Sequence, residues 1–235
     1  MPTPAPASPA VRLSVIVPAY NEARVIEATL RHVRELAPEA ELIVADGGST
    51  DGTREIASRW AAVAESAKGR GLQLNAGAAR ARGDWLLFLH ADTRLPAGFA
   101  GEIAKMAGRG CRAGAFRLRI AGRHPLLPLL AWGANLRSRW RGIAFGDQAF
   151  FAEASLFQRL DGFPPIPLME DYAWCLRLRR EGVRLCLAAL AVETSGRRWD
   201  ERGFFRTWWT MRRLLWSYRS GNDPARLPQG YPDVR

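Results

Sequence analysis

The sequence lacks long apolar runs and contains little cysteine. None of its uncharged apolar runs approaches the ~18–20 residues of a membrane-spanning helix, and the longest strongly apolar stretch, 125–136, is too short. We therefore expect no integral membrane protein. The three cysteines, Cys111, Cys175 and Cys186, form no CxxC pair and leave one over in any disulfide scheme. We expect free, buried thiols in a reducing compartment.

The sequence also lacks a signal peptide, because residues 1–10 have neither a basic start nor an apolar core. We expect residues 1–10 to form a disordered Pro/Ala tail and the protein to be cytoplasmic. Neither a Walker A pattern (GxxxxGK[ST]) nor GxGxxG occurs, which removes the main support for a P-loop ATPase and for ordinary NAD binding.

Lysine is scarce, because Lys68 and Lys105 are the only two in the chain. The 34 basic residues against 23 acidic ones nevertheless give a net charge of +11. Such a field favours anionic partners: a nucleotide or sugar phosphate, a lipid surface, or nucleic acid. The basic residues are spread along the chain and no nucleic-acid-binding motif is present, so we expect no nucleic-acid partner.

Short apolar runs alternate with helical patterns through the first 95 residues. Strands are predicted at 13–18, 41–45, 61–65 and 85–89. Helices are predicted at 53–60, at 71–82 and before them between Asn21, which would cap the first helix, and Pro38, which would end it. This order predicts βαβ units and hence an α/β fold, a single Rossmann-like domain with a mainly parallel central sheet flanked by helices.

The second half is less regular. Its patterns predict strands at 111–120 and 148–153 and helices at 169–181 and 204–219. We divide the chain into the tail 1–10, a domain over 11–220 with a nucleotide-binding half (11–95) and an acceptor half (96–200), and a C-terminal helix and tail over 201–235.

Three loops follow predicted strands, at 18–22, 46–53 and 90–93, where open α/β sheets bind ligands. The second loop combines glycines, which let a ligand approach closely, with Asp46, which can accept hydrogen bonds from a ribose or a base edge. Asp92 suits a divalent ion on a diphosphate, with His90 as a candidate second ligand. Each feature also has a structural explanation. The 46–53 loop could be an ordinary strand-to-helix turn, Asp92 could cap the next turn, and His90 could be a hydrogen-bonded structural histidine.

Glu170 and Asp171 open a predicted helix behind a proline-rich loop. Acidic residues stabilise helix N-termini, which is one explanation, and a carboxylate held as general base is the other. The Arg197-Arg198-Trp199 segment follows a Thr-Ser-Gly turn, where its arginines either grip a phosphate or form a solvated patch.

Six motifs occur in a fixed order: PAYNE (18–22), ADGGSTDGT (45–53), KGRGLQLNAG (68–77), HADT (90–93), MEDY (169–172) and RRW (197–199). In this order the chain resembles the family-2 glycosyltransferases over roughly residues 11–220, and its ending is similar to a bacterial subgroup called the selenodomain-associated transferases. The resemblance implies a GT-A fold and inverting transfer of a sugar from a nucleotide-diphosphate sugar, which we interpret as a UDP-sugar, to an acceptor hydroxyl.

The resemblance also implies a role for each matching residue. Those expected at the nucleotide are Pro18, Ala19, Tyr20, Glu22, Asp46, Gly47, Lys68, Asn75 and Ala91. Asp92 and His90 would hold Mn2+ or Mg2+ on the diphosphate. Asp171 would be the general base, with Glu170 in support. Lys68, Arg198 and Trp199 would lie at the departing diphosphate.

Two positions depart from the family pattern. His90 stands where the metal motif usually begins with a carboxylate, which puts the identity of the metal in question. Ser195 stands where processive synthases carry the glutamine of QxxRW, and their membrane helices are absent, so we do not expect a processive polysaccharide synthase.

Two rival functions fit parts of the sequence. A sugar-phosphate nucleotidyltransferase usually carries a glycine-rich basic loop after its first strand, whereas PAYNE is acidic and contains no glycine. A basic nucleic-acid-binding module agrees with the net charge but lacks a recognisable motif.

The predicted C-terminal helix carries two aromatic stripes. At ~100° per residue, one stripe gathers Phe204, Trp208, Met211, Leu215 and Tyr218, which we expect to pack on the domain. The second consists of Phe205, Trp209 and Trp216, bordered by arginines. It predicts either a wide core face or peripheral contact with an anionic membrane, at the inner face of which a membrane-proximal acceptor would lie.

Overall fold

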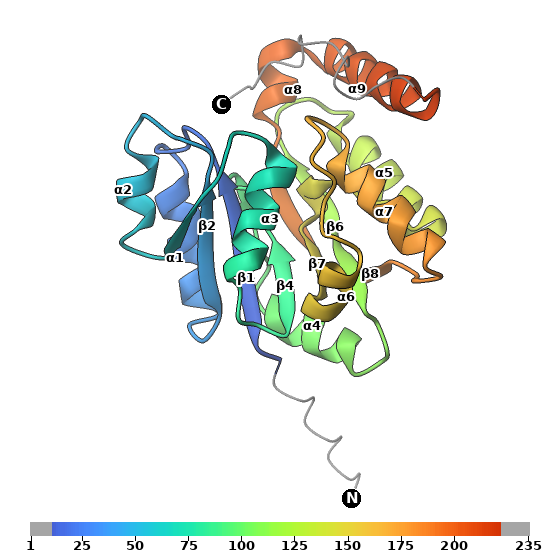
Figure 1. The fold of residues 1–235 in the computed structure, drawn as a ribbon. Coiled ribbons are helices and arrows are strands. Elements are labelled where there is room, and N and C mark those ends of the chain that lie inside the picture. Colours follow the sequence, from blue (N-terminus) through green and yellow to red (C-terminus); the bar gives the residue numbers. More distant parts are fainter. Residues whose placement is uncertain (1–10, 222–235) are drawn as a thin grey trace, which may run out of the picture.

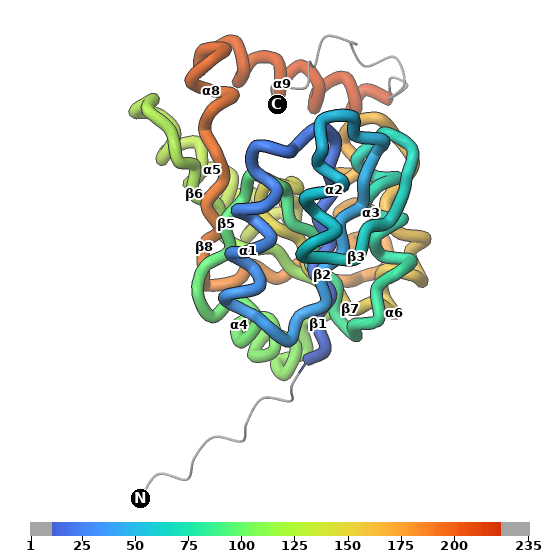
Figure 2. Tube along the Cα trace, turned by 90° about the vertical axis from the view of Figure 1, so that its left-hand side faces the viewer, coloured from blue at the N-terminus to red at the C-terminus, as the bar shows by residue number. Residues whose placement is uncertain are grey.

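The computed structural model describes residues 11–221, which form an eight-stranded sheet with helices packed on both faces (Figure 1 and Figure 2). Residues 1–10 and 222–235 lie outside the described residues, and with them the predicted N-terminal tail and the end of the C-terminal segment. The strand order is β3-β2-β1-β4-β7-β6-β8-β5.

The first half is a parallel α/β unit. Its elements are β1 (Leu13–Ala19), α1 (Ile26–Leu36), β2 (Glu41–Asp46), α2 (Thr53–Ala57), β3 (Ala62–Glu65), α3 (Arg70–Arg80) and β4 (Trp85–Phe88). β1 pairs in parallel with β2 and β4, and β2 with β3. Val15, Ile16 and Val17 are fully buried and alternate between two cores, because each face of the sheet is covered by helices. The predicted strands and the α/β fold are confirmed.

The second half is mixed in direction. Its elements are β5 (Thr93–Arg94), α4 (Phe99–Ala107), β6 (Ala113–Ala121), α5 (Leu127–Arg141), the 3-10 turn η1 (Gly146–Gln148), β7 (Phe150–Glu153), α6 (Ala154–Arg159), α7 (Glu170–Arg180), β8 (Cys186–Ser195), α8 (Arg197–Arg202) and α9 (Phe204–Arg219). β7 is antiparallel to both β4 and β6, and β5 to β8, whereas β6 and β8 are parallel. The sheet is therefore parallel only among β1 to β4 and between β6 and β8.

Two local predictions are wrong. Asn21 does not cap α1, which begins five residues later; it adopts a left-handed φ of 55°, and its side chain accepts a hydrogen bond from Thr50 instead. The cysteines are not all free, because Cys111 and Cys186 form a disulfide between the starts of the neighbouring strands β6 and β8. Cys175 is free and buried, as expected. The argument from free thiols to a reducing compartment therefore does not hold.

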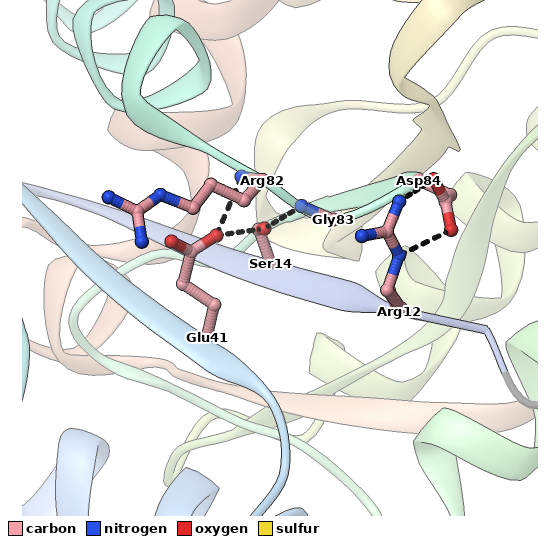
Figure 3. A network of polar contacts seen from close by, with 6 residues as sticks. All are labelled: Arg12, Ser14, Glu41, Arg82, Gly83 and Asp84. Carbon is pink, nitrogen blue, oxygen red and sulfur yellow. Dashed lines mark hydrogen bonds and ion pairs between the residues drawn. The ribbon is translucent and has the colours of Figure 1, made fainter.

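A polar network closes the amino ends of β1, β2 and β4 (Figure 3). Arg12 donates two hydrogen bonds to the carboxylate of Asp84, of 2.9 and 2.7 Å. The hydroxyl of the fully buried Ser14 donates to Glu41 and accepts from the backbone N–H of Gly83 at 2.9 Å, in a space that a Cβ on Gly83 would fill. Each carboxylate in this network has a donor.

The helix α9 lies at the opposite end, beyond the carboxyl end of β1 (Figure 1 and Figure 2). Its side chains Phe204, Thr207 and Leu214 are buried. The prediction that Trp208 packs on the domain is wrong, because its side chain is 36% exposed. Among residues 11–221, none of the helices combines the length and the apolar character needed to cross a membrane.

Candidate active site

The loops that follow β1 and β2 are fastened to each other at the carboxyl edge of the sheet. The backbone N–H of Asn21 donates to the hydroxyl of Ser49 at 2.9 Å, and the N–H of Glu22 donates to that of Thr53 at 2.8 Å. Pro18 and Ala19, the last residues of β1, pair with Ala45 and Asp46 of β2. These two loops, which follow predicted strands, therefore lie against each other.

Asp46 is 3% exposed and organises its own loop. Its carboxylate accepts hydrogen bonds from the N–H groups of Gly48 and Ser49, at 3.0 and 3.1 Å, and from the Ser49 hydroxyl. Each carboxylate oxygen has two acceptor positions, so this internal use leaves capacity for a ligand. A Cβ on Gly47 would come within 3.0 Å of the Gln73 side chain, which explains the glycine there.

Gln73, on α3, was not singled out by the sequence. Its buried side chain donates to the carbonyl oxygens of Ala19 (2.6 Å) and Ala45 (3.1 Å) and so joins the ends of β1 and β2. Just before α3, the ammonium of Lys68 lies 4.1 Å from the centre of the Tyr20 ring, a cation–π contact between two residues predicted at the nucleotide.

Asp171 lies in the first turn of α7 and is 9% exposed. One carboxylate oxygen accepts the backbone N–H of Gly146 at 2.7 Å, and the other accepts the N–H of Tyr172 at 2.6 Å. A Cβ on Gly146 would lie 2.6 Å from Nε2 of His90, at the end of β4. Glycine at this point therefore lets the side chains of His90 and Asp171 both come close to η1 at Gly146.

Burial dominates the electrostatics of this region. It raises the pKa of Glu170 to about 7, with the neighbouring Asp171 charge as the second cause, and it raises the pKa of Asp171 as well. Burial together with the nearby Arg70 and Arg198 charges lowers the pKa of His90 well below its usual value. At neutral pH His90 is therefore a neutral imidazole, and its buried Nε2 has no hydrogen-bond partner among the described residues.

Asp147, in η1, is a further member of the site that the sequence reasoning missed. Burial raises its pKa to about 6, and the charges of Asp171 and Asp92 contribute in the same direction against the opposing charge of Arg137. Within residues 11–221, its buried Oδ1 also lacks a hydrogen-bond partner. The sequence offered one indication, a Gly-Asp pair directly before a predicted strand, but the hydrophobic pattern does not indicate that this turn lies near α7.

Arg70 is the second missed residue, although it stands inside the KGRG motif. Its guanidinium lies 3.7 Å from Glu170, and its charge lowers the pKa of Asp147, Glu170 and Asp171 alike. One cation at the start of α3 thus holds down the pKa of three carboxyl groups, while burial pushes each of them up.

Three residues predicted at the site, Asn75, Ala91 and Trp199, make contacts that hold the fold together. The Asn75 side chain exchanges two hydrogen bonds with the backbone of Phe163, of 2.7 and 2.9 Å, so a contact with the nucleotide would have to break them. Ala91 is buried, and its carbonyl accepts the Thr29 hydroxyl. Trp199 is 7% exposed and packs against Phe204, whereas Arg198 is near enough to His90 to lower its pKa.

The residues predicted to hold a metal do not form a complete site by themselves. Asp92 is exposed, His90 offers a neutral nitrogen, and no cluster of three or more ligating side chains occurs between residues 11 and 221. An orphaned imidazole nitrogen beside carboxylates nevertheless fits a divalent ion whose remaining ligands come from diphosphate oxygens and water.

Comparison with known proteins gives a family match over part of the chain. Residues 14–126 match the model of glycosyl transferase family 2. The glycosyltransferase AglD of Haloferax volcanii is 30% identical over 248 residues, covering 86% of this chain and 38% of AglD. The succinoglycan biosynthesis protein ExoA of Rhizobium meliloti is 53% identical over 49 residues, covering 20% of this chain and 15% of ExoA. The chain thus spans less than two-fifths of the length of either relative.

Solved structures share the fold. A mannosyltransferase from Pyrobaculum calidifontis, in complex with GDP-Man and Mn2+, superposes with a TM-score of 0.65 at 24% identity, covering 87% of this chain and 61% of that one. A glucosyl-3-phosphoglycerate synthase from Mycobacterium tuberculosis, in complex with Mg2+ and UDP, gives 0.58 at 25% identity, covering 80% and 71%. The chain shares the GT-A type of fold with these neighbours, and its residues 14–126 are similar to glycosyl transferase family 2.

Proposed function

We propose that the chain transfers a sugar from a nucleotide-diphosphate sugar, a UDP-sugar, to an acceptor hydroxyl with inversion at the sugar carbon. The observation that carries the proposal is the buried Asp171, fixed by the N–H of Gly146, a residue whose Cβ position is also close to the neutral His90. The nucleotide-side loops are fastened together at the carboxyl ends of β1 and β2. A proton acceptor and a donor-binding edge therefore belong to one domain.

Asp171 acts as the general base. An acceptor hydroxyl is a weak nucleophile until its proton is removed, and a carboxylate with a raised pKa removes it more effectively than an ordinary aspartate. As the acceptor oxygen bonds to the sugar carbon, its proton passes to Asp171. The bond between that carbon and the diphosphate oxygen breaks, and the nucleoside diphosphate leaves with the electron pair.

The neighbours of Asp171 set its orientation and charge. The Gly146 and Tyr172 N–H groups hold the carboxylate in place. Glu170, with its pKa raised to about 7, and Asp147, with its pKa raised to about 6, are partly protonated near neutral pH. Partial protonation limits the negative charge around Asp171 and keeps Asp171 itself available as the ionised base.

The donor residues follow from the fastened loops. Asp46 accepts hydrogen bonds from the uracil or ribose, while Tyr20 and Glu22 line the nucleotide. Lys68 and Arg198 stabilise the negative charge that grows on the departing diphosphate. Support comes from their placement: Lys68 stacks on Tyr20, and Arg198 acts electrostatically on His90.

The divalent metal fits this arrangement through His90 and Asp92. Such an ion, Mn2+ or Mg2+, would supply positive charge at the diphosphate. The neutral, unpartnered Nε2 of His90 supports its role as a ligand, and the Coulombic effect of Asp92 on Asp147 indicates that Asp92 faces the same region. The selenodomain-associated subgroup and a cytoplasmic location stay predictions.

A thermal-shift panel tests the donor. UDP, GDP, ADP and NAD, each with Mn2+, are compared on the wild type, on Asp46→Ala and on Asp84→Ala, which removes a carboxylate from the opposite end of the sheet. UDP at ~100 times its Kd should stabilise the fold by about 2.7 kcal/mol. We expect Asp46→Ala to abolish this shift and Asp84→Ala to keep it. A rise in melting temperature with GDP alone would mean that the donor is a GDP-sugar and not a UDP-sugar. A rise with NAD alone would contradict the proposal.

A further inference from the structure

The outward face of α9 carries large aromatic side chains. Phe205 is 71% exposed, Trp209 61% and Trp216 70%. At ~100° per residue these three lie within a narrow sector of the helix, opposite the buried Phe204, Thr207 and Leu214. The structure therefore separates the two stripes: the first, apart from the exposed Trp208, packs on the domain, and the second faces solvent. We call Phe205, Trp209 and Trp216 the α9 outer stripe.

Arginines border the α9 outer stripe on both sides. Arg212 and Arg219 lie on one side, with the Arg212 guanidinium 5.4 Å from the centre of the Trp208 ring and the Arg219 guanidinium donating to the Tyr172 hydroxyl. Arg206 and Arg213 lie on the other side and are exposed. The helix contains no acidic residue. An aromatic centre with cationic borders is the composition of a helix that lies in the interface of an anionic bilayer.

The helix is also firmly attached to the catalytic half of the molecule. Its first turns share an apolar cluster with Leu127 and Trp199, and its last turn brings Tyr218 to 5.5 Å from Tyr172, ring centre to ring centre. Tyr172 follows Asp171 directly. An external surface that bound the outer face of α9 would therefore lie on the same side of the molecule as the start of α7 (Figure 1).

We propose that the α9 outer stripe docks the protein on an anionic lipid bilayer, with the three rings in the headgroup layer and the arginines on lipid phosphates. Charge complementarity selects this partner. A second copy of the chain would set arginine borders against arginine borders, whereas an anionic surface pairs with both. Docking does not depend on the transfer reaction, so either proposal can fail without the other.

Vesicle co-sedimentation of the full chain tests the docking. Wild type is spun with vesicles of phosphatidylcholine alone and of phosphatidylcholine mixed with phosphatidylglycerol, at low and at physiological salt. We expect pelleting with the anionic vesicles, weaker at the higher salt. The Trp209→Ser/Trp216→Ser variant should lose at least about tenfold in partitioning. The Arg206→Gln/Arg213→Gln variant should lose about 25-fold on anionic vesicles.

Two matched controls make the result specific to α9. Trp140→Ser removes an indole that is 77% exposed on α5, and Arg82→Gln/Arg109→Gln removes the same charge from exposed positions elsewhere. Both should pellet like wild type, and all variants should keep the wild-type melting temperature in the absence of vesicles. The proposal is overturned if wild type stays in the supernatant throughout, if a control variant loses as much binding as its α9 counterpart, or if sedimentation shows a dimer that the tryptophan substitutions dissociate.

Discussion

The polar groups at the two ends of β1, β2 and β4 differ in how completely they are hydrogen-bonded. At the amino end, Glu41 accepts from Ser14 and from the Arg82 backbone, and Asp84 forms two bonds with Arg12. At the carboxyl end, Nε2 of His90 is buried without a hydrogen-bond partner in the described part of the chain. In the same region, Asp147 and Glu170 each have one buried carboxylate oxygen without a hydrogen-bond partner among the described residues, and both have raised pKa values.

The difference separates stability from function within one sheet. Paired groups at the amino end hold the strands and the turn before β4 together. Buried, incompletely paired groups at the carboxyl end cost folding free energy, and such a cost persists at sites where a ligand or a proton will use the groups. Substitutions at the two ends should therefore have opposite signatures.

The largest effect is expected from Asp171→Asn. The amide keeps the size of the side chain but cannot take a proton, so transfer should fall by ~10²–10⁴-fold. Donor binding, measured by titration calorimetry, should remain within a few-fold of wild type. The matched change at the amino end, Asp84→Asn, should leave the rate unaltered. Equal losses of rate in Asp171→Asn and Asp84→Asn would contradict the assignment of catalysis to the carboxyl end alone.

Asp147→Asn should stabilise the protein in a pH-dependent way. The pKa of Asp147 rises from 3.8 to about 6 on folding, so the folded state binds the proton more tightly, and wild type loses stability as the pH rises through this window. Asparagine has no proton to lose. The variant should therefore be more stable by about 3 kcal/mol above pH 6, with the gain vanishing below pH 4. Urea unfolding at several pH values measures this, and a gain that is independent of pH would contradict the assignment.

Ser14→Ala, at the amino end of the strands, should destabilise the protein and leave its activity unaltered. It leaves the buried N–H of Gly83 without its acceptor and takes one donor from Glu41, which should cost about 1–3 kcal/mol of unfolding free energy. Because the network is remote from Asp171, kcat should be unaltered at a temperature where the variant is folded. A loss of kcat without a loss of stability would show that the amino end takes part in function.

The smallest effect is a shift of the pH profile in Arg70→Met. The Arg70 charge lowers the pKa of Asp171, Glu170 and Asp147, so its removal should raise all three. The base is then protonated at a higher pH, and the acid limb of the kcat/KM profile should move upward. The control Arg82→Met, at the amino end, should not move it. A downward shift would contradict the electrostatic role of Arg70.

The sequence predicted most of the parallel half, because β-branched runs such as Val15-Ile16-Val17 can be buried on both faces only in a covered sheet. It also identified Asp171 at the start of a helix. What it missed depends on contacts between distant segments. Asn21 binds Thr50 instead of capping α1, and Cys111 reaches Cys186 across 75 residues. Periodicity carries no information about such pairs.

Asp147 and Arg70 escaped for the same reason. Asp147 stands in a short turn and Arg70 at the start of a helix, and only the packing of η1 and α3 near α7 places their charges close to Asp171. Asn75 shows the converse, since its position in a recognised motif suggested a nucleotide contact, while its amide is bonded to Phe163. The order of the motifs pointed to the resemblance to family 2 glycosyltransferases, whereas the contacts of each side chain could be learned only from the fold.

The pH dependence of nucleoside diphosphate release from the donor, with a cell extract supplying the acceptor, tests the central claim most directly. Burial raises the pKa of Asp171 above 3.8, so wild type should show an acid limb in kcat/KM at a pH above that value, with activity rising as the base ionises. In Asp171→Asn this limb should disappear along with most of the rate. An Asp171→Asn variant that keeps both the wild-type rate and the wild-type limb would show that another group takes the proton.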